Sequence, residues 1–242
     1  MPGWKRAHTF LQRHPEVLIH YGRDGTGDIY HLENQASFLE LCSGRTHVFT
    51  ADGGFDFSED YATQEKNVYP LLLASCKIGL QALLPGGLFI MKLFDVFGKP
   101  TQYLLRLITS CFRDWTLYKP ATSRPCNSER YLVCRGFRRC PPAILAQLAE
   151  MENKIQTGLY PDLSGQIPWT LEETECLQNH IQIFTSTQCK TIENSFQYKE
   201  ISLAKFDWDL HIRNAQAWCS AFRVPCNLQV STNLYKSFGY KA

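Results

Sequence analysis

Residues 86–94 read Gly-Gly-Leu-Phe-Ile-Met-Lys-Leu-Phe, and this stretch decides the fold class of the chain. The apolar run from Leu88 to Phe94 predicts a strand of the kind that flanking helices bury on both faces. A helix is predicted before it, because apolar residues recur at helical spacing from Gln64 to Leu84 and Pro85-Gly86-Gly87 ends that pattern. The lysine inside so apolar a strand requires an explanation, since lysine is rarely buried without a partner.

Further strands and helices are predicted on either side of this strand. Thr46 to Ala51 predicts a strand that ends at Asp52-Gly53-Gly54. After the strand at residues 88–94 we expect a helix at residues 100–112, a strand at 115–119, a polar loop at 120–129 and a last strand at 130–134. This alternation predicts an α/β sheet whose last two strands are antiparallel.

The character of the sequence changes after Arg139. Pro141-Pro142 opens a region without a strand pattern but with helical patterns at residues 143–155, 171–189 and 203–222. We therefore expect a sheet-containing domain over residues 1–140 and a helical C-terminal extension over residues 141–242. The extension is expected to pack on the sheet domain and not to form a second catalytic unit.

Composition restricts the class of protein only loosely. The net charge of +2 permits a nucleic-acid partner without arguing for one. The ten cysteines include no Cys-x-x-Cys pair, which favours reduced thiols in an intracellular protein over a metal or redox site. We find neither a signal peptide nor an apolar stretch long enough to cross a membrane, and we expect no metal.

Three polar residues occupy positions at which α/β sheets place their chemistry, at or just beyond strand ends. Asp52 ends one predicted strand, Lys92 lies within the most apolar strand, and Glu129 precedes the last strand. Taken by itself, the position of Lys92 supports a functional and a structural interpretation equally. In the structural interpretation, Lys92 reaches solvent from the strand end and pairs with Asp95.

Four motifs in order change this balance. They are Tyr21-Gly22-Arg23-Asp24-Gly25-Thr26-Gly27-Asp28-Ile29, Ala51-Asp52-Gly53-Gly54-Phe55, Gly86-Gly87-Leu88-Phe89-Ile90-Met91-Lys92, and residues 119–134, which read KPATSRPCNSERYLVC. Together they resemble the FtsJ/RrmJ-like superfamily, and within it the Adrift-type cap-specific mRNA (nucleoside-2'-O-)-methyltransferases. The resemblance runs from about Tyr21 to Cys134 and more loosely through the helical tail.

The resemblance implies a Rossmann-like sheet that binds S-adenosyl-L-methionine (SAM) and methylates a ribose 2'-hydroxyl of RNA, near the 5' cap of mRNA. The family uses a Lys-Asp-Lys-Glu tetrad, whose last three members correspond to the catalytic candidates Asp52, Lys92 and Glu129. It also implies SAM contacts from Gly27, Asp28 and Asp52, and RNA contacts from Lys119, Arg124, Asn127 and Ser128. Two of these have a competing interpretation, because Asp28 is equally well a turn residue in a glycine-rich loop and a lysine at a strand end is usually just solvated.

The chemistry explains these residue types. Methyl transfer to a hydroxyl requires the oxygen to be held in line with the methyl group and its proton to be removed. We expect Lys92 to be the base, or at least to orient the hydroxyl. Asp52 would then steer Lys92 and the methyl group, and Glu129 would hold the ammonium and the ribose.

Part of the family pattern is not found in the chain. The glycine-rich turn ending in Pro-Gly-Gly-Phe or Pro-Gly-Ala-Phe, which wraps the methionine end of SAM, and the first tetrad lysine are both missing. We therefore expect a sheet without its N-terminal strands. Three explanations remain: a fragment whose upstream segment is encoded elsewhere, an inactive remnant that serves as an RNA-binding or scaffold module, or a partner chain that completes the SAM pocket. The compartment is also open between the nucleus, the cytoplasm and a viral factory.

Overall fold

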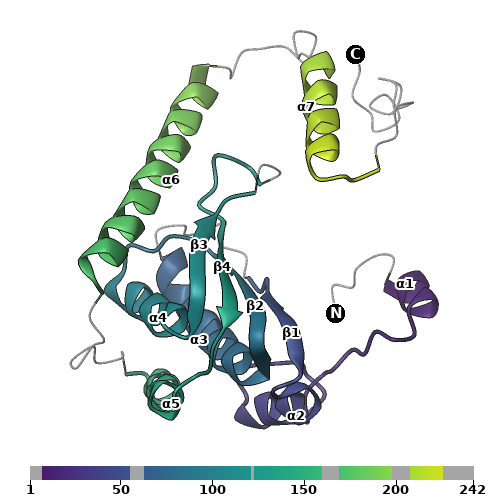
Figure 1. Cartoon of the computed structure of the whole chain (residues 1–242), viewed down its shortest axis with the longest axis vertical. Helices are drawn as coiled ribbons and strands as arrows, with labels where there is room; N and C mark the ends of the chain where they lie inside the picture. The colour runs from purple at the N-terminus through teal and green to yellow at the C-terminus, as the bar shows by residue number, and fades with distance from the viewer. Residues whose placement is uncertain (1–6, 55–62, 121–122, 160–168, 198–207, 226–242) are drawn as a thin grey trace. The chain divides into compact units, whose positions relative to one another are not determined.

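A computed structural model of the chain describes residues 7–54, 63–120, 123–159, 169–197 and 208–225. Their helices and strands follow in the order α1 (Ala7–Arg13), α2 (Leu32–Cys42), β1 (Thr46–Ala51), α3 (Gln64–Ala82), β2 (Leu83–Leu93), α4 (Lys99–Thr109), β3 (Phe112–Tyr118), β4 (Arg130–Phe137), α5 (Pro142–Gln156), α6 (Leu171–Gln197) and α7 (Trp208–Ala221) (Figure 1). The chain divides into two compact units, Met1–Gln188 and Cys189–Ala242. The predicted division after residue 140 separates the strands from the later helices but does not coincide with this boundary.

The four strands form one sheet in the order β1-β2-β4-β3, as the α/β prediction required. β1 and β2 are parallel and are joined through α3, so they form a β-α-β unit. The predicted antiparallel pairing of β3 with β4 is confirmed, and β2 also pairs with β4 in the antiparallel sense. Among the described residues β1 lies at the edge of the sheet.

One face of the sheet carries the hydrophobic core. Alternate residues of β2, namely Phe89, Met91 and Leu93, are fully buried beneath α3 and α4, which cover this face (Figure 1). Burial of such side chains is the main favourable term in folding. The other residues of β2, Leu88, Ile90 and Lys92, are only half-buried. The prediction that helices bury both faces is therefore wrong for the described residues, and Val48 of β1 stays 52% exposed on the open side.

The start of β2 differs from the prediction. Pro85-Gly86-Gly87, expected to end the preceding helix, lies inside β2, because α3 already ends at Ala82 and the strand begins at Leu83. The pairing with β1 is irregular there, since Thr46 faces Leu83 whereas Val48 faces Leu88. Gly86 has a φ of +84°, a conformation that glycine adopts without strain. The glycines therefore form an irregularity in the strand and not a helix cap.

The helices after β4 are close to those predicted. α5 and α6 contain the predicted ranges 143–155 and 171–189, and α6 continues to Gln197. The predicted helix 203–222 corresponds to α7, although its first five residues lie outside the described part of the chain. No helix in the part that the structure describes is both long and apolar enough to cross a membrane.

Gly79 of α3 fixes the distance between this helix and the sheet. A β-carbon placed there would lie 2.5 Å from Cε2 of Phe89 and 2.8 Å from Cδ1 of Phe49. These two rings stack on each other with their centroids 5.5 Å apart, so neither can move without disturbing the β1–β2 pair.

We expect Gly79→Ala to lower the free energy of unfolding by about 1–2 kcal/mol, because overpacking of the core outweighs the roughly 1 kcal/mol gained in helix propensity. Urea denaturation measures this change. In a Phe89→Leu background the same substitution should cost less, since the smaller side chain makes room for the added methyl group. An equal cost in both backgrounds would contradict the close packing inferred for Gly79.

Candidate active site

Asp52 and Lys92 meet where β1 ends. The parallel register pairs Ala51 with Met91, so the residues that follow them, Asp52 and Lys92, lie side by side. Nζ of Lys92 is 2.7 Å from Oδ1 of Asp52 and also donates a hydrogen bond to the main-chain oxygen of Asp52 at 3.2 Å. The Lys92 side chain is only 17% exposed, whereas that of Asp52 is 66% exposed. The partner considered in the structural interpretation, Asp95, pairs with Arg130 instead, at 3.3 Å.

Glu129 reaches the same face of the sheet through Tyr131. Tyr131 of β4 lies directly opposite Lys92, and strand alternation places Glu129, two residues earlier, on the same side. The Tyr131 hydroxyl donates a 2.9 Å hydrogen bond to Oε1 of Glu129, and Nδ2 of Asn127 donates to Oε2 at 3.2 Å. Asp52, Lys92 and Glu129 therefore gather on one face, around Tyr131.

The chemistry of Tyr131 reflects this environment. Burial raises the pKa of its hydroxyl, and together with the hydrogen bond to Glu129 and the negative charges of Asp52 and Glu129 it brings the pKa to about 12. The hydroxyl thus stays protonated and holds Glu129 in place. Sequence reasoning missed Tyr131, although its position two residues after Glu129 on a strand was a usable signal.

The loop between β3 and β4 is held from within by Lys119. Its Nζ donates to the main-chain oxygens of Asn127 and Glu129, at 2.9 and 2.8 Å, and to Oδ1 of Asn127 at 2.8 Å. Burial lowers the pKa of Lys119. Lys119 is half-buried and Ser128 is buried, and the Ser128 hydroxyl donates to Oε1 of Gln64 at 3.4 Å. Of the four predicted RNA-binding residues, Arg124 is exposed and Asn127 half-buried, whereas Lys119 and Ser128 hold the loop together.

Helix α6 packs against the loop between β3 and β4. Arg130, at the start of β4, is 1% exposed and donates through Nε to the main-chain oxygen of Ser128 at 3.0 Å. Its guanidinium lies 5.0 Å from the centre of the Phe184 ring of α6. Further along α6, Gln188 donates from Nε2 to the main-chain oxygen of Cys126 at 3.4 Å. Packing on α6 therefore helps to fix the loop that carries Asn127 and Glu129.

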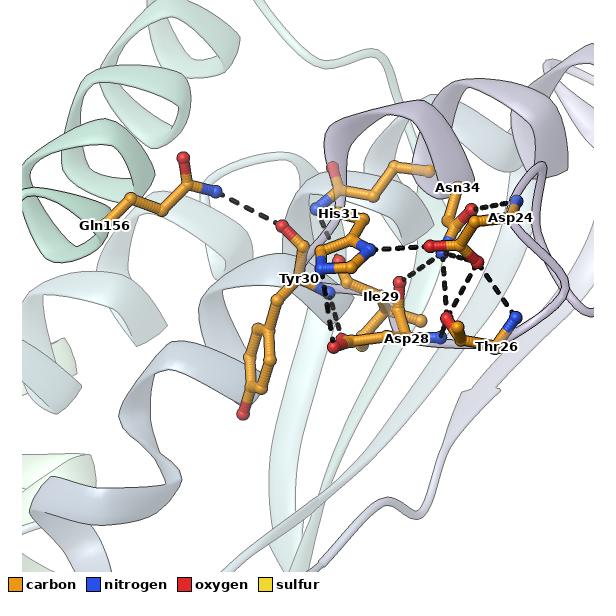
Figure 2. Close-up of polar contacts among 9 residues, drawn as sticks. Asp24, Thr26, Asp28, Ile29, Tyr30, His31, Asn34 and Gln156 are labelled. Carbon is orange, nitrogen blue, oxygen red and sulfur yellow. Dashed lines mark hydrogen bonds and ion pairs between the residues drawn. The ribbon is translucent and has the colours of Figure 1, made fainter. Parts of the chain in front are cut away.

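The glycine-rich segment at residues 21–31 is organised by Asp24. Figure 2 shows its carboxylate at the centre of the segment, where it accepts hydrogen bonds from the main-chain N–H and the hydroxyl of Thr26, from Nδ2 of Asn34 and from Nδ1 of His31. These donors, the Thr26 main-chain N–H foremost, hold the pKa of Asp24 well below its usual range. The hydrogen bond from His31 in turn raises the pKa of that imidazole above 6.5.

The two cofactor candidates of this segment are held in turns. Oδ1 of Asp28 accepts the main-chain N–H of Tyr30 at 2.8 Å, as the turn interpretation required (Figure 2). The Asp28 side chain is nevertheless 42% exposed, so it keeps acceptor capacity for a ligand. Gly27 has a φ of +74° and donates its N–H to the main-chain oxygen of Tyr21. A cofactor contact by either residue stays a prediction.

A pocket of about 290 Å³ lies between this segment, the end of β1 and α3. Its walls are mostly apolar, with a few polar groups from α2 and the segment; they include His20, Gly27, Ile29, Asn34, Phe38, Phe49, Ala51, Gly53 and Ile78. Ala51 and Gly53 flank Asp52, so one end of the pocket adjoins the Asp52–Lys92 pair. Among the described residues, no group of three or more His, Cys, Asp or Glu side chains is arranged to hold a metal ion.

Asp24→Asn should lower the pKa of His31, because the amide no longer stabilises the imidazolium as a carboxylate does. NMR titration of the His31 ring protons measures this shift. Since the folded-state pKa lies above the usual 6.5, the stabilisation from this pair is fully present below pH 6.5 and is lost as the pH rises through the folded-state pKa. Glu33→Gln is the control, since Glu33 contributes least to the shift. Superimposable titrations of the wild type and Asp24→Asn would contradict this role of Asp24.

The chain is similar in sequence to known proteins. Residues 6–137 match the family described as FtsJ-like methyltransferase. A protein of Trypanosoma brucei brucei named cap-specific mRNA (nucleoside-2'-O-)-methyltransferase 1 is 40% identical over 129 residues, which are 50% of this chain and 33% of that protein. Proteins with the same name in Danio rerio and Homo sapiens are 37% identical over 146 residues and 40% identical over 122 residues.

The match is local in these relatives. It covers 58% of this chain but 18% of the Danio rerio protein, and 48% of this chain but 15% of the human protein. The chain thus spans a third or less of the length of these relatives. The family match over residues 6–137 includes the glycine-rich segment, the Asp52–Lys92 pair and the Glu129 loop, and it extends over more than half of the chain. The chain belongs to the FtsJ-like methyltransferase family.

Proposed function

We propose that this chain carries the catalytic face of a SAM-dependent enzyme that methylates the ribose 2'-hydroxyl of RNA, near the 5' cap of mRNA. The observation that carries the proposal is the 2.7 Å pair of Lys92 with Asp52, beside Tyr131 and Glu129 on one face of the sheet. The names of the relatives support the choice of a capped RNA substrate. Because those relatives act on mRNA caps, the nucleus or the cytoplasm is the proposed compartment.

The residues present fit the adenosine part of SAM. When bound, SAM supplies a methyl group on a positively charged sulfur. The 290 Å³ pocket is at the lower end of the range for ligand sites, and its apolar walls suit a purine ring. Gly27 and Asp28 would hold the nucleoside at one end. At the other end Asp52, exposed and negatively charged, would face the sulfonium.

In the proposed reaction, Lys92 acts on the hydroxyl that accepts the methyl group. In its neutral amine form, after one proton has passed to solvent, its Nζ orients the 2'-oxygen and accepts the proton that the hydroxyl loses. Asp52 fixes Nζ through two contacts, to its carboxylate and to its main-chain oxygen. Glu129, held by Tyr131 and Asn127, hydrogen-bonds the ribose. This set places one amine and two carboxylates around a sugar hydroxyl.

The RNA is proposed to approach across the loop between β3 and β4. Arg124 is exposed and free to contact a phosphate, and Asn127 adjoins Glu129. Lys119 and Ser128, which point into the loop, contribute by keeping its main chain in place. Arg124 is therefore the residue of this group on which affinity for the RNA backbone should depend most.

We expect Lys92→Met to reduce methyl transfer by at least about 100-fold, as is typical when a catalytic acid–base group is removed. The measurement is transfer of a radioactive methyl group from SAM to a capped RNA oligonucleotide. Lys99→Met is the matched control, since Lys99 is an exposed lysine at the start of α4 and should leave the rate unchanged. RNA that already carries 2'-O-methyl groups at its first two nucleotides should accept no methyl group.

Calorimetry distinguishes a methyltransferase from the alternative function, a non-catalytic RNA-binding or scaffold module. Binding of SAM or of its demethylated product, S-adenosylhomocysteine, to the wild-type chain supports the proposal. Binding of capped RNA without binding of either nucleoside would identify a non-catalytic RNA-binding or scaffold module instead. If the Lys92→Met variant transferred the methyl group at the wild-type rate, Lys92 would have no part in the mechanism.

A further inference from the structure

Helix α5 contacts the glycine-rich segment, although it lies outside residues 6–137 that match the family. Near the end of α5, Gln156 donates from Nε2 to the main-chain oxygen of Tyr30 at 3.2 Å (Figure 2). One helical turn earlier, Glu152 is buried and acts on the same segment through Gln35 of α2. Both contacts end on main-chain oxygens next to Asp28, which is a candidate cofactor residue.

Glu152 joins three parts of the fold. Its Oε1 accepts a 2.6 Å hydrogen bond from Nε2 of Gln35, and its Oε2 pairs with Nζ of Lys77 of α3. Nε2 of Gln35 also donates to the main-chain oxygen of Ile29 at 2.7 Å. With 7% and 2% of their surfaces exposed, Glu152 and Gln35 are shielded from water, so these contacts are not exchanged for contacts with solvent.

The carboxylate of Glu152 decides which way the Gln35 amide points. In the observed orientation both N–H groups of Nε2 are used, while Oε1 of Gln35 is buried with no hydrogen-bond partner among the described residues. The opposite orientation would direct the amide oxygen at two other oxygens, those of Ile29 and Glu152. Because Glu152 is acceptor-only when ionised, it excludes that orientation and keeps the bond to Ile29.

We infer that Glu152 is a positioning residue for the cofactor pocket, acting through the Gln35 amide on the main chain at Ile29. Ile29 lines the pocket beside Gly27, and Asp28 lies between them. The part of this inference that concerns SAM rests on the proposed function. The part that concerns the segment itself does not.

Glu152→Gln separates positioning from general stability. The two carboxylate oxygens of Glu152 accept from Gln35 and Lys77 separately, whereas a glutamine must turn its NH2 group toward one of these two donors. Adding Lys77→Met removes one of the two donors, so the oxygen is again available to Gln35. Glu152→Gln should therefore release the segment, and Glu152→Gln with Lys77→Met should restore it. Glu150→Gln is the matched control on the same helix, because Glu150 is exposed and forms an ion pair with Lys154.

Hydrogen–deuterium exchange of the main-chain amides of Gly27, Tyr30 and His31, which are hydrogen-bonded in the wild type, measures the effect. We expect about tenfold faster exchange in Glu152→Gln, recovery to within about twofold in the double variant, and no change in Glu150→Gln. Exchange in Glu152→Gln equal to the wild type, or no recovery in the double variant, would overturn the inference. A uniform increase across α3 and α5 would overturn it as well, since that indicates a purely structural role.

Calorimetry with S-adenosylhomocysteine on the same four proteins connects the segment to the cofactor. We expect about tenfold weaker binding in Glu152→Gln and recovery in the double variant. If the wild type itself binds no S-adenosylhomocysteine, the proposed function fails while the exchange data still decide the role of Glu152. Binding that is unchanged in Glu152→Gln, although exchange at the three amides rises, would overturn the link between Glu152 and the pocket.

Discussion

The ion pair between Lys92 and Asp52 is the interaction on which the rest of the site depends. A lysine in an apolar strand is tolerated only with a partner that compensates for its lost hydration. The parallel register of β1 and β2 supplies that partner, because it places Asp52 beside Lys92 at the point where β1 ends. The packing of α3 on both strands, where Gly79 leaves no room for a β-carbon, fixes this register. The charge pair and the core thus require each other.

The antiparallel side of the sheet completes the arrangement. Tyr131 faces Lys92 across β2 and β4, and its protonated hydroxyl binds Glu129. Because this hydroxyl stays protonated, it donates to Glu129 and adds no further negative charge near Asp52. Since Asn127 and Lys119 hold the loop on the other side of Glu129, its position follows from the loop as much as from the strand.

Local patterns predicted most of the sheet, whereas contacts between distant segments were not predictable. The existence of β2 and the position of Lys92 within it were readable because an apolar run is a local property, whereas the burial of only one face was not foreseen. Pro85-Gly86-Gly87 was misassigned, because glycine is typical both of a strand irregularity and of a helix end. The pairing of Gln35 with Glu152, 117 positions apart, leaves no periodic signal, and neither does the packing of Phe184 against Arg130. Such contacts arise only once the helices are placed.

The contacts of the later helices also explain how they serve the site without lining it. Glu152, through Gln35, and Gln156 secure main-chain oxygens at Ile29 and Tyr30, and Gln188 does the same at Cys126. Main-chain oxygens are present whatever the side chain, so the loops can still present Asp28 and Arg124 outward. Both loops therefore gain order from α5 and α6 at no cost to their ligand-facing groups. On these grounds the physical unit of the site extends beyond the last strand, into helices that the family match does not include.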